Sequence, residues 1–188
     1  MKSVSMSGLP RVNVGKKDAK AQRKQGFIPC VMYGGEKQLQ FIVPEQQFKD
    51  VIYTPEVKYV EMELDGNTHI TVIQDTQWHP ITDKLLHVDF LEVDERRQVT
   101  MGIPVQVVGT SPGVLRGGKL VKKYRKLKVK GLLQNLPEKI EIDITPLDIN
   151  DNIKVSDIQL DNIIIVENPG TIIVSVASTR NVEQTQQG

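Results

Sequence analysis

The stretch Gln74–Phe90, QDTQWHPITDKLLHVDF, decides how the rest of the chain is interpreted. It holds all but one of the histidines, the only tryptophan and a proline, between two apolar runs. Polar and apolar side chains alternate at its end: His87, Asp89 and Glu92 against Val88, Phe90 and Val93. A period of two predicts a strand with one polar and one apolar face. An exposed His beside an Asp can hydrogen-bond bases, a 2′-hydroxyl or a phosphate, or act as a catalytic pair, and the stretch alone does not decide which.

Short apolar-rich segments continue toward the N-terminus, separated by turn residues. The patterns predict strands at residues 2–14 with an interruption near Gly8, and at residues 27–33, 39–43, 59–64 and 69–73. A helix is expected from Lys17 to Gln25, and a second one opens at Pro44. Many short strands with two short helices predict a mainly β fold that begins with a small closed β-barrel.

The charged run 94–97, DERR, is the candidate boundary between two domains, residues 1–94 and residues 95–188. Beyond it, strand patterns occur at residues 99–108, 126–131, 140–144, 163–166 and 171–176. Residues 110–118 are rich in turn formers and predict a loop. The second half is therefore expected to be a separate β-rich domain.

Length and composition place the chain among ordinary globular proteins. It has 188 residues, of which 39% are hydrophobic and 25% charged. A single cysteine, Cys30, excludes an internal disulfide and a multi-cysteine zinc site. No apolar run approaches the roughly 20 residues that span a bilayer, and the N-terminus lacks the apolar core of a signal peptide. A soluble cytoplasmic protein without a membrane partner is expected.

The net charge of +1 hides an uneven distribution. Residues 1–35 contain seven Lys or Arg and one acid, and residues 115–130 contain eight Lys or Arg and no acid. Residues 138–170 hold eight acids and two lysines. Because local fields attract a polyanion, the two basic segments are candidate RNA contacts, although a solvated surface explains each of them as simply.

Both basic segments have a regular arrangement. Lys16, Lys20 and Lys24 are four residues apart and share one side of the first predicted helix, which has no large apolar residue. In the second segment the lysines alternate with apolar residues along a predicted strand: Lys126, Lys128 and Lys130. The run Arg116–Lys130 is hypothesised to be a second, weaker contact with RNA or with another protein.

No catalytic constellation emerges from the sequence. His87 and Asp89 could bind a metal from one strand face, but His79 precedes Pro80 at a turn, and no third ligand has a suitable spacing. Cys30 lies in an apolar strand pattern, which does not favour a reactive thiolate. Gly117-Gly118-Lys119 lacks the spacing of a phosphate-binding loop. We therefore expect no enzyme, no metal, no cofactor and no small-molecule substrate.

The same segments resemble a known family. QDTQWHP followed by LLHVDF, and GKKDAKAQRKQGFIPCVMYGG near the N-terminus, resemble the bacterial 5S-rRNA-binding ribosomal protein family called large-subunit protein twenty-five. IPVQVVGTSPGVLRGG and LDINDNIKVSDIQL resemble the second domain of its long form, also named CTC or general stress protein. The resemblance covers nearly the whole chain.

The resemblance implies a structural protein of the large ribosomal subunit that docks on 5S rRNA through its N-terminal barrel and neighbours other ribosomal proteins. It implies that Lys16, Lys20 and Arg23 contact phosphates. The family positions that touch RNA correspond to six further residues here: Arg11, Tyr33, Gln74, Gln77, His87 and Asp89. Such proteins recognise RNA by its backbone shape, its wide minor groove and its 2′-hydroxyls.

Two segments depart from the family's usual pattern. Ala21 and Gln22 stand where the helix commonly has Arg and Leu, and Trp78 stands where an Arg usually precedes the His-Pro pair. Trp78 either stacks on RNA or is buried. The alternatives to the ribosomal role are a non-ribosomal RNA-binding or stress-response module and an enzyme that uses His87 and Asp89.

Overall fold

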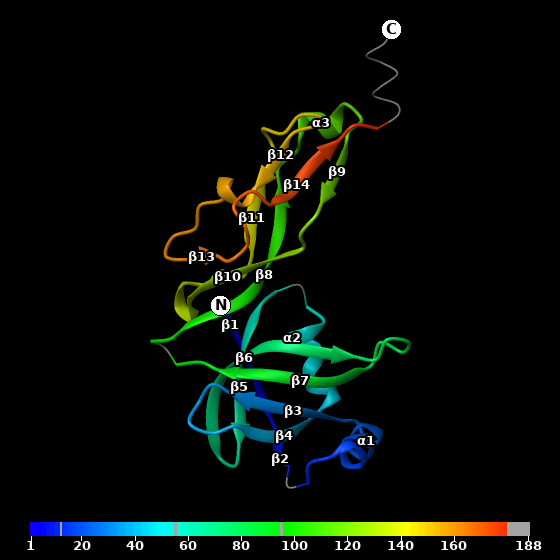
Figure 1. The fold of residues 1–188 in the computed structure, drawn as a ribbon, viewed down its shortest axis with the longest axis vertical. Helices are drawn as coiled ribbons and strands as arrows, with labels where there is room; N and C mark the ends of the chain where they lie inside the picture. The colour runs from blue at the N-terminus through cyan, green and yellow to red at the C-terminus, as the bar shows by residue number, and fades with distance from the viewer. Residues whose placement is uncertain (12, 55, 95, 180–188) are drawn as a thin grey trace. The chain divides into compact units, whose positions relative to one another are not determined.

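The structure is a computed structural model that describes residues 1–11, 13–54, 56–94 and 96–179. The chain divides into two compact units, residues 1–99 and residues 100–188. Both units are built mainly from strands, as the sequence predicts (Figure 1).

The first unit is a single seven-stranded sheet. Its strands are β1 (Lys2–Ser7), β2 (Leu9–Pro10), β3 (Phe27–Tyr33), β4 (Leu39–Pro44), β5 (Lys58–Leu64), β6 (Asn67–Trp78) and β7 (Leu85–Glu92). They are hydrogen-bonded in the order β1-β5-β6-β7-β3-β4-β2. The strand β3 runs parallel to β7, and β6 runs antiparallel to β7.

The two edges of this sheet are consecutive pieces of the same chain segment. β1 pairs in parallel with β5 at one edge, and β2 pairs antiparallel with β4 at the other. Only Gly8 separates them, so the sheet closes on itself as the predicted barrel. A Cβ atom at Gly8 would lie 2.7 Å from Cδ2 of Leu64 and 2.8 Å from Cδ2 of Phe41. The closure therefore requires the smallest residue at this position.

The inside of the barrel is filled by alternate residues of the strands. On β7, Val88 and Phe90 are fully buried. The ring of Phe90 lies 5.8 Å from that of Phe41 and 6.4 Å from that of Phe48, centroid to centroid. Since successive side chains of a strand point to opposite faces, this packing turns His87 and Asp89 outward.

Two helical segments accompany the barrel. α1 (Lys16–Lys24) has no buried residue and packs against β3, and Gly26 follows it with a φ of 83°. A 3₁₀ helix (Glu45–Phe48) continues into α2 (Lys49–Ile52) and is anchored by the buried Phe48. These are the two predicted short helices. No helix of the described residues has the length and apolar character needed to cross a membrane.

The second unit contains two smaller sheets. Its strands are β8 (Gln98–Val108), β9 (Lys119–Lys122), β10 (Lys126–Leu132), β11 (Ile140–Asp143), β12 (Asn152–Lys154), β13 (Ile164–Ile165) and β14 (Ile172–Ala177). One sheet has the order β11-β8-β10-β13 and the other the order β12-β14-β9. Two 3₁₀ helices, Leu133–Asn135 and Val155–Asp157, lie in its connections.

The loop predicted at residues 110–118 contains one turn of helix, α3 (Pro112–Leu115). The backbone N–H of Val114 donates to the Ser111 side chain, 3.3 Å away, and that hydroxyl donates to the carbonyl of Leu147 at 2.6 Å. A serine cap followed by a proline is a helix-start signal. The predicted turn-rich loop therefore includes this single helical turn, which the prediction did not specify.

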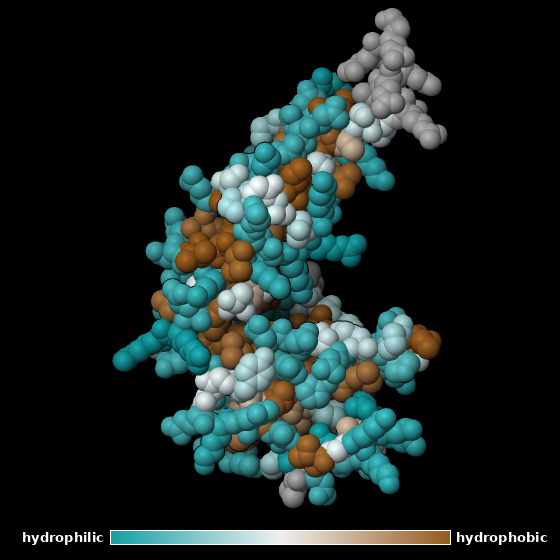
Figure 2. All heavy atoms as spheres, in the orientation of Figure 1, coloured by the Kyte–Doolittle hydropathy of each residue, from teal (hydrophilic) through white to brown (hydrophobic). Residues whose placement is uncertain are grey.

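The alternation predicted for β10 is confirmed. Leu127 and Val129 are fully buried, while Lys126, Lys128 and Lys130 are exposed. Figure 2 shows a largely hydrophilic surface with an apolar patch over the segment labelled β13 in Figure 1.

Candidate nucleic-acid interface

Polar side chains gather on the outside of the barrel, on the neighbouring strands β6 and β7. Asp75 lies opposite Asp89, and Gln77 lies opposite His87. Residues directly opposite each other on antiparallel strands point to the same face. Because the intervening Val88 points inward, all four side chains project from the outer surface.

Tyr33 joins this surface from β3. In the parallel pairing of β3 with β7, Val31 is the partner of Asp89, and Tyr33 lies two residues further along the same face. Burial raises the pKa of the Tyr33 phenol, and the negative charges of Asp89 and Asp75 raise it further. The phenol therefore remains a protonated hydrogen-bond donor. We call Tyr33, Asp75, Gln77, His87 and Asp89 the polar face.

His87 and Asp89 form a close pair in the middle of the polar face. The Nδ1 atom of His87 lies 2.7 Å from Oδ1 of Asp89, and both side chains are a little over a quarter exposed. The contact has the distance of an ion pair, but Nδ1 of His87 is buried and has no well-directed hydrogen-bond partner among the described residues. The carboxylate of Asp89 therefore stays available as an acceptor for a ligand.

Asp75 is the member of the polar face that the sequence interpretation missed. Its Oδ1 accepts the backbone N–H of Thr76 at 2.8 Å, and it lies directly across from Asp89. Two carboxylates side by side repel phosphate and favour hydrogen-bond donors. The centre of the polar face thus suits amino groups of bases and 2′-hydroxyls. Only knowledge of the strand pairing could have placed Asp75 there.

Positive charge lies next to the polar face, on α1. Lys16 and Lys20 are exposed on this helix, which packs against β3, the strand that carries Tyr33. The lysines and the carboxylates of the polar face therefore occupy different elements. The helix is suited to phosphates, and the sheet is suited to donor groups.

Arg11 and Arg23 have partners within the protein. Nε of Arg11 donates to Oδ2 of Asp18 at 2.7 Å, and the Arg11 side chain is only 10% exposed. An Arg23 N–H donates to the carbonyl of Leu86 at 3.3 Å, which ties α1 to β7. Both arginines hold α1 in place beside the barrel. Their predicted contact with RNA stays a prediction.

Gln74 and Glu92 differ from the simple alternation. The pairing of β6 with β7 shifts between Ile73 and Asp75, so Gln74 is the extra residue of a β-bulge, and it is exposed. Grouping Glu92 with His87 and Asp89 was wrong, because residues three apart on a strand point to opposite faces. Oε1 of Glu92 instead lies 2.7 Å from Nδ1 of His69.

Trp78 is not buried. Its side chain is 36% exposed, its ring meets that of Tyr53 edge to face with centroids 5.9 Å apart, and its Nε1 donates to Oγ1 of Thr76 at 3.0 Å. Of the two predicted alternatives, burial is therefore excluded. The pair of aromatic rings offers an apolar surface at the end of β6.

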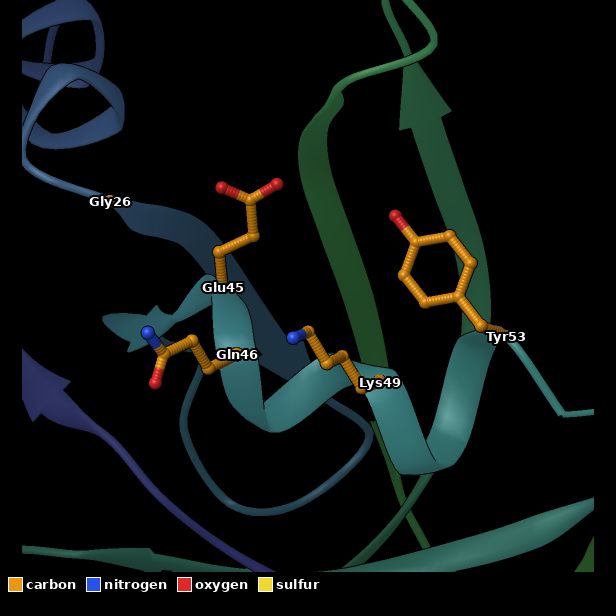
Figure 3. Close-up of a pocket in the computed structure, with 5 residues that line it drawn as sticks. All are labelled: Gly26, Glu45, Gln46, Lys49 and Tyr53. Atoms are coloured by element: carbon orange, nitrogen blue, oxygen red, sulfur yellow. The ribbon is translucent and has the colours of Figure 1, made fainter.

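Tyr53 also lines a pocket of about 660 Å³ in the first unit. The other lining residues are Gly26, after α1, and Glu45, Gln46 and Lys49 on the helical segment before Tyr53 (Figure 3). Glu45 gives the pocket an acidic side chain, and Lys49 gives it a basic one. None of the five residues is among the predicted RNA contacts, and no sequence motif marked them.

The other candidates for a site are Cys30 and the residue types that bind metals. Burial, and to a smaller extent the charge of Asp89, raise the pKa of the Cys30 thiol well above its usual value. Cys30 is therefore an unreactive core residue. Within the described residues, no group of three or more His, Cys, Asp or Glu side chains could hold a metal ion.

Comparison with known proteins finds a matching family model for each of the two units. The family model "Ribosomal L25p family" matches residues 6–90, and the model "Ribosomal protein TL5, C-terminal domain" matches residues 98–180. A relative from Cytophaga hutchinsonii named "Large ribosomal subunit protein bL25" is 44% identical over 99% of this chain and 97% of its own length. The chain belongs to the ribosomal L25p family.

The similarity to two further members also covers nearly the whole length of this chain and of theirs. The proteins of that name from Amoebophilus asiaticus and Porphyromonas gingivalis are 38% and 37% identical over 96% of this chain, and the matches cover 92% and 95% of their own lengths. The resemblance to the long form of the family is thereby confirmed. Membership of a ribosomal protein family also confirms that the chain is not an enzyme.

Proposed function

We propose that the chain is a structural constituent of the large ribosomal subunit and binds 5S rRNA through its first domain, residues 1–94. In this proposal the protein is cytoplasmic and associated with ribosomes, and residues 95–188 form a second domain. Membership of the L25p family supports the ribosomal role. The choice of 5S rRNA rests on the resemblance of the polar-face strands to that family.

The observation that carries the proposal is the packing of the basic helix α1 beside the polar face. Lys16 and Lys20 are exposed on α1, whereas Asp89 and Tyr33 are acceptor and donor on the adjacent strands. An RNA duplex presents phosphates at the rims of its wide minor groove and 2′-hydroxyls and base edges inside it. The lysines match the rims, and the polar face matches the interior.

Each predicted contact has a distinct role in this arrangement. Lys16, Lys20 and Arg23 neutralise phosphates, and Arg11 keeps α1 in the position that allows this through Asp18. Gln77 on β6 and His87 on β7 are directly opposite each other. Their side chains offer both hydrogen-bond donors and acceptors to the groove edges. Gln74, displaced by the bulge, extends the same surface.

The direct test is the binding of the purified full-length protein to 5S rRNA over a range of salt concentrations, with tRNA as competitor. We expect selective binding whose logarithmic affinity falls linearly with the logarithm of the salt concentration, because phosphate contacts release counterions. Binding that tRNA competes away as well as 5S rRNA itself would contradict the proposal.

A charge-matched pair of variants distinguishes the contribution of the α1 lysines from that of the total charge. K16Q/K20Q removes two charges from α1, and K139Q/K154Q removes two charges from the acid-rich segment of the second unit. The first variant should weaken 5S rRNA binding and the second should not. Equal weakening by both variants would show that total charge, and not the proposed surface, governs binding.

A further inference from the structure

The second unit presents a row of lysines on the outer face of β10. Lys126, Lys128 and Lys130 are all exposed, and the residues between them are buried in the core. Residues two apart on a strand are separated by about 6.7 Å. The row is therefore a regular cationic line, and these three residues are called the lysine row below.

Exposed aliphatic side chains lie directly beside the lysine row. Ile164 of β13 is the antiparallel partner of Lys130, and the N–H of Val166 donates to the carbonyl of Lys128 at 2.9 Å. Opposite residues of antiparallel strands share a face. Ile164 is 61% exposed and Val166 is 53% exposed. The two residues are called the aliphatic edge below.

On its other side the lysine row borders Gly102 of β8. A Cβ atom at Gly102 of β8 would lie 3.8 Å from both Cβ and Cδ of Lys126, so the lysine stem lies along the glycine. The face thus carries cations on β10 and aliphatic side chains on the neighbouring segment that contains β13. Only some of the cations of the basic run take part, since the ammonium of Lys122 donates to the carbonyl of Val105.

The combination points to a protein partner more than to RNA. Phosphates would satisfy the lysine row but would leave Ile164 and Val166 without an apolar neighbour. A protein interface, in contrast, places aliphatic side chains at its centre and charged groups at its rim. Because the side formed by β10 is cationic, complementarity on that side requires a partner that carries carboxylates.

We infer that the lysine row and the aliphatic edge together form a docking surface for a protein whose own surface carries carboxylates beside aliphatic side chains. The aliphatic contacts supply the apolar burial. The lysine row aligns the partner and excludes basic surfaces. This inference concerns the second unit alone and is independent of the binding of 5S rRNA by the first.

The test is site-specific photo-crosslinking in growing cells with the full-length chain. Benzoylphenylalanine is placed at Ile164, and at Leu115 as a control that is also exposed and lies on α3 of the same unit. We expect a product at position 164 that protease digests and RNase does not, with its crosslinked peptide containing Asp or Glu and aliphatic residues. A product that RNase removes, or a yield no higher than at Leu115, would overturn the inference.

Charge-reversal variants show whether the lysine row directs the partner. K128E/K130E should lower the crosslinking yield at Ile164 about tenfold, while K119E/K123E, with the same change of charge at two other exposed lysines of the unit, should leave it unchanged. Thermal unfolding of each variant establishes that the unit is folded. An equal loss in both variants, or no loss in K128E/K130E, would contradict the docking surface.

Discussion

The basic helix of the first unit and the lysine row of the second carry similar charge in different settings. On α1 no residue is buried, and the lysines lie next to a sheet whose face contains two opposed carboxylates and a tyrosine. On β10 the lysines alternate with a buried core, and their neighbours on β13 are aliphatic. The surroundings of the charges, more than their number, distinguish the proposed RNA contact from the proposed protein contact.

The difference also concerns how each surface depends on its fold. The polar face combines three neighbouring strands of the seven-stranded sheet, and the basic helix α1 packs against one of them, β3. The lysine row lies on one strand, and its aliphatic edge on the next one. Disruption of the barrel core should therefore destroy the first surface while leaving the second intact.

The largest expected effect follows from truncating one buried side chain in the core of either unit. Phe90→Ala should destabilise the first unit by about 3–5 kcal/mol, and Leu127→Ala should destabilise the second by about 2–5 kcal/mol. Trp78 is the only tryptophan of the chain and lies in the first unit, so its fluorescence during urea unfolding reports that unit alone. F90A should shift this transition and L127A should not. If both shift it equally, the two surfaces do not depend on separate cores.

The next effect separates the two opposed carboxylates of the polar face. Asp89→Asn removes a charged acceptor and should weaken 5S rRNA binding by about 1.5–3 kcal/mol. Asp75→Asn should weaken binding less, because Oδ1 of Asp75 already accepts the backbone N–H of Thr76. Titration of labelled 5S rRNA measures both. A loss in D75N as large as in D89N would mean that both carboxylates accept hydrogen bonds from RNA.

A smaller effect concerns the lysines of α1. K16Q/K20Q should reduce the slope of log affinity against log salt by about 1.5, since each phosphate contact contributes about 0.7–0.9. K126Q/K128Q in the lysine row should leave the slope for 5S rRNA unchanged. Filter binding at four or five salt concentrations gives both slopes. A reduced slope in the second variant would place RNA on the second unit.

The smallest effect is a pH dependence confined to the second unit. The Asp143 carboxylate accepts the hydroxyl of Thr145 at 2.5 Å and its N–H at 2.9 Å, and these bonds hold the pKa of Asp143 below its usual value. The stabilisation is present above the unfolded-state pKa near 3.8 and is lost as the pH falls through the folded-state pKa. Asp143→Asn should flatten the loss of thermal stability below about pH 4, and Asp161→Asn should not.

The sequence predicted the elements that depend on local patterns. The alternations in β7 and β10, the helix before Gly26 and the outward direction of His87 and Asp89 all follow from the spacing of polar and apolar residues. The family resemblance supplied the ribosomal role, which no composition or spacing could have given. Both were confirmed where the structure and the comparisons test them.

Features that depend on long-range pairing were not predictable from one sequence. Asp75 faces Asp89, and Ile164 faces Lys130, only because of strand registers that local patterns do not specify. The bulge at Gln74 changes the direction of every later side chain on β6. The pairing of Arg11 with Asp18 likewise depends on how the chain enters α1.

The most direct test of the whole account compares the two surfaces in one assay. Affinity for 5S rRNA is measured for the full-length protein, for Tyr33→Ala combined with His87→Ala, and for the triple variant K126Q/K128Q/K130Q. We expect the first variant to lose at least tenfold in affinity and the triple variant to bind as the unchanged protein does. The opposite pattern, with binding retained in the first variant and lost in the triple variant, would contradict it.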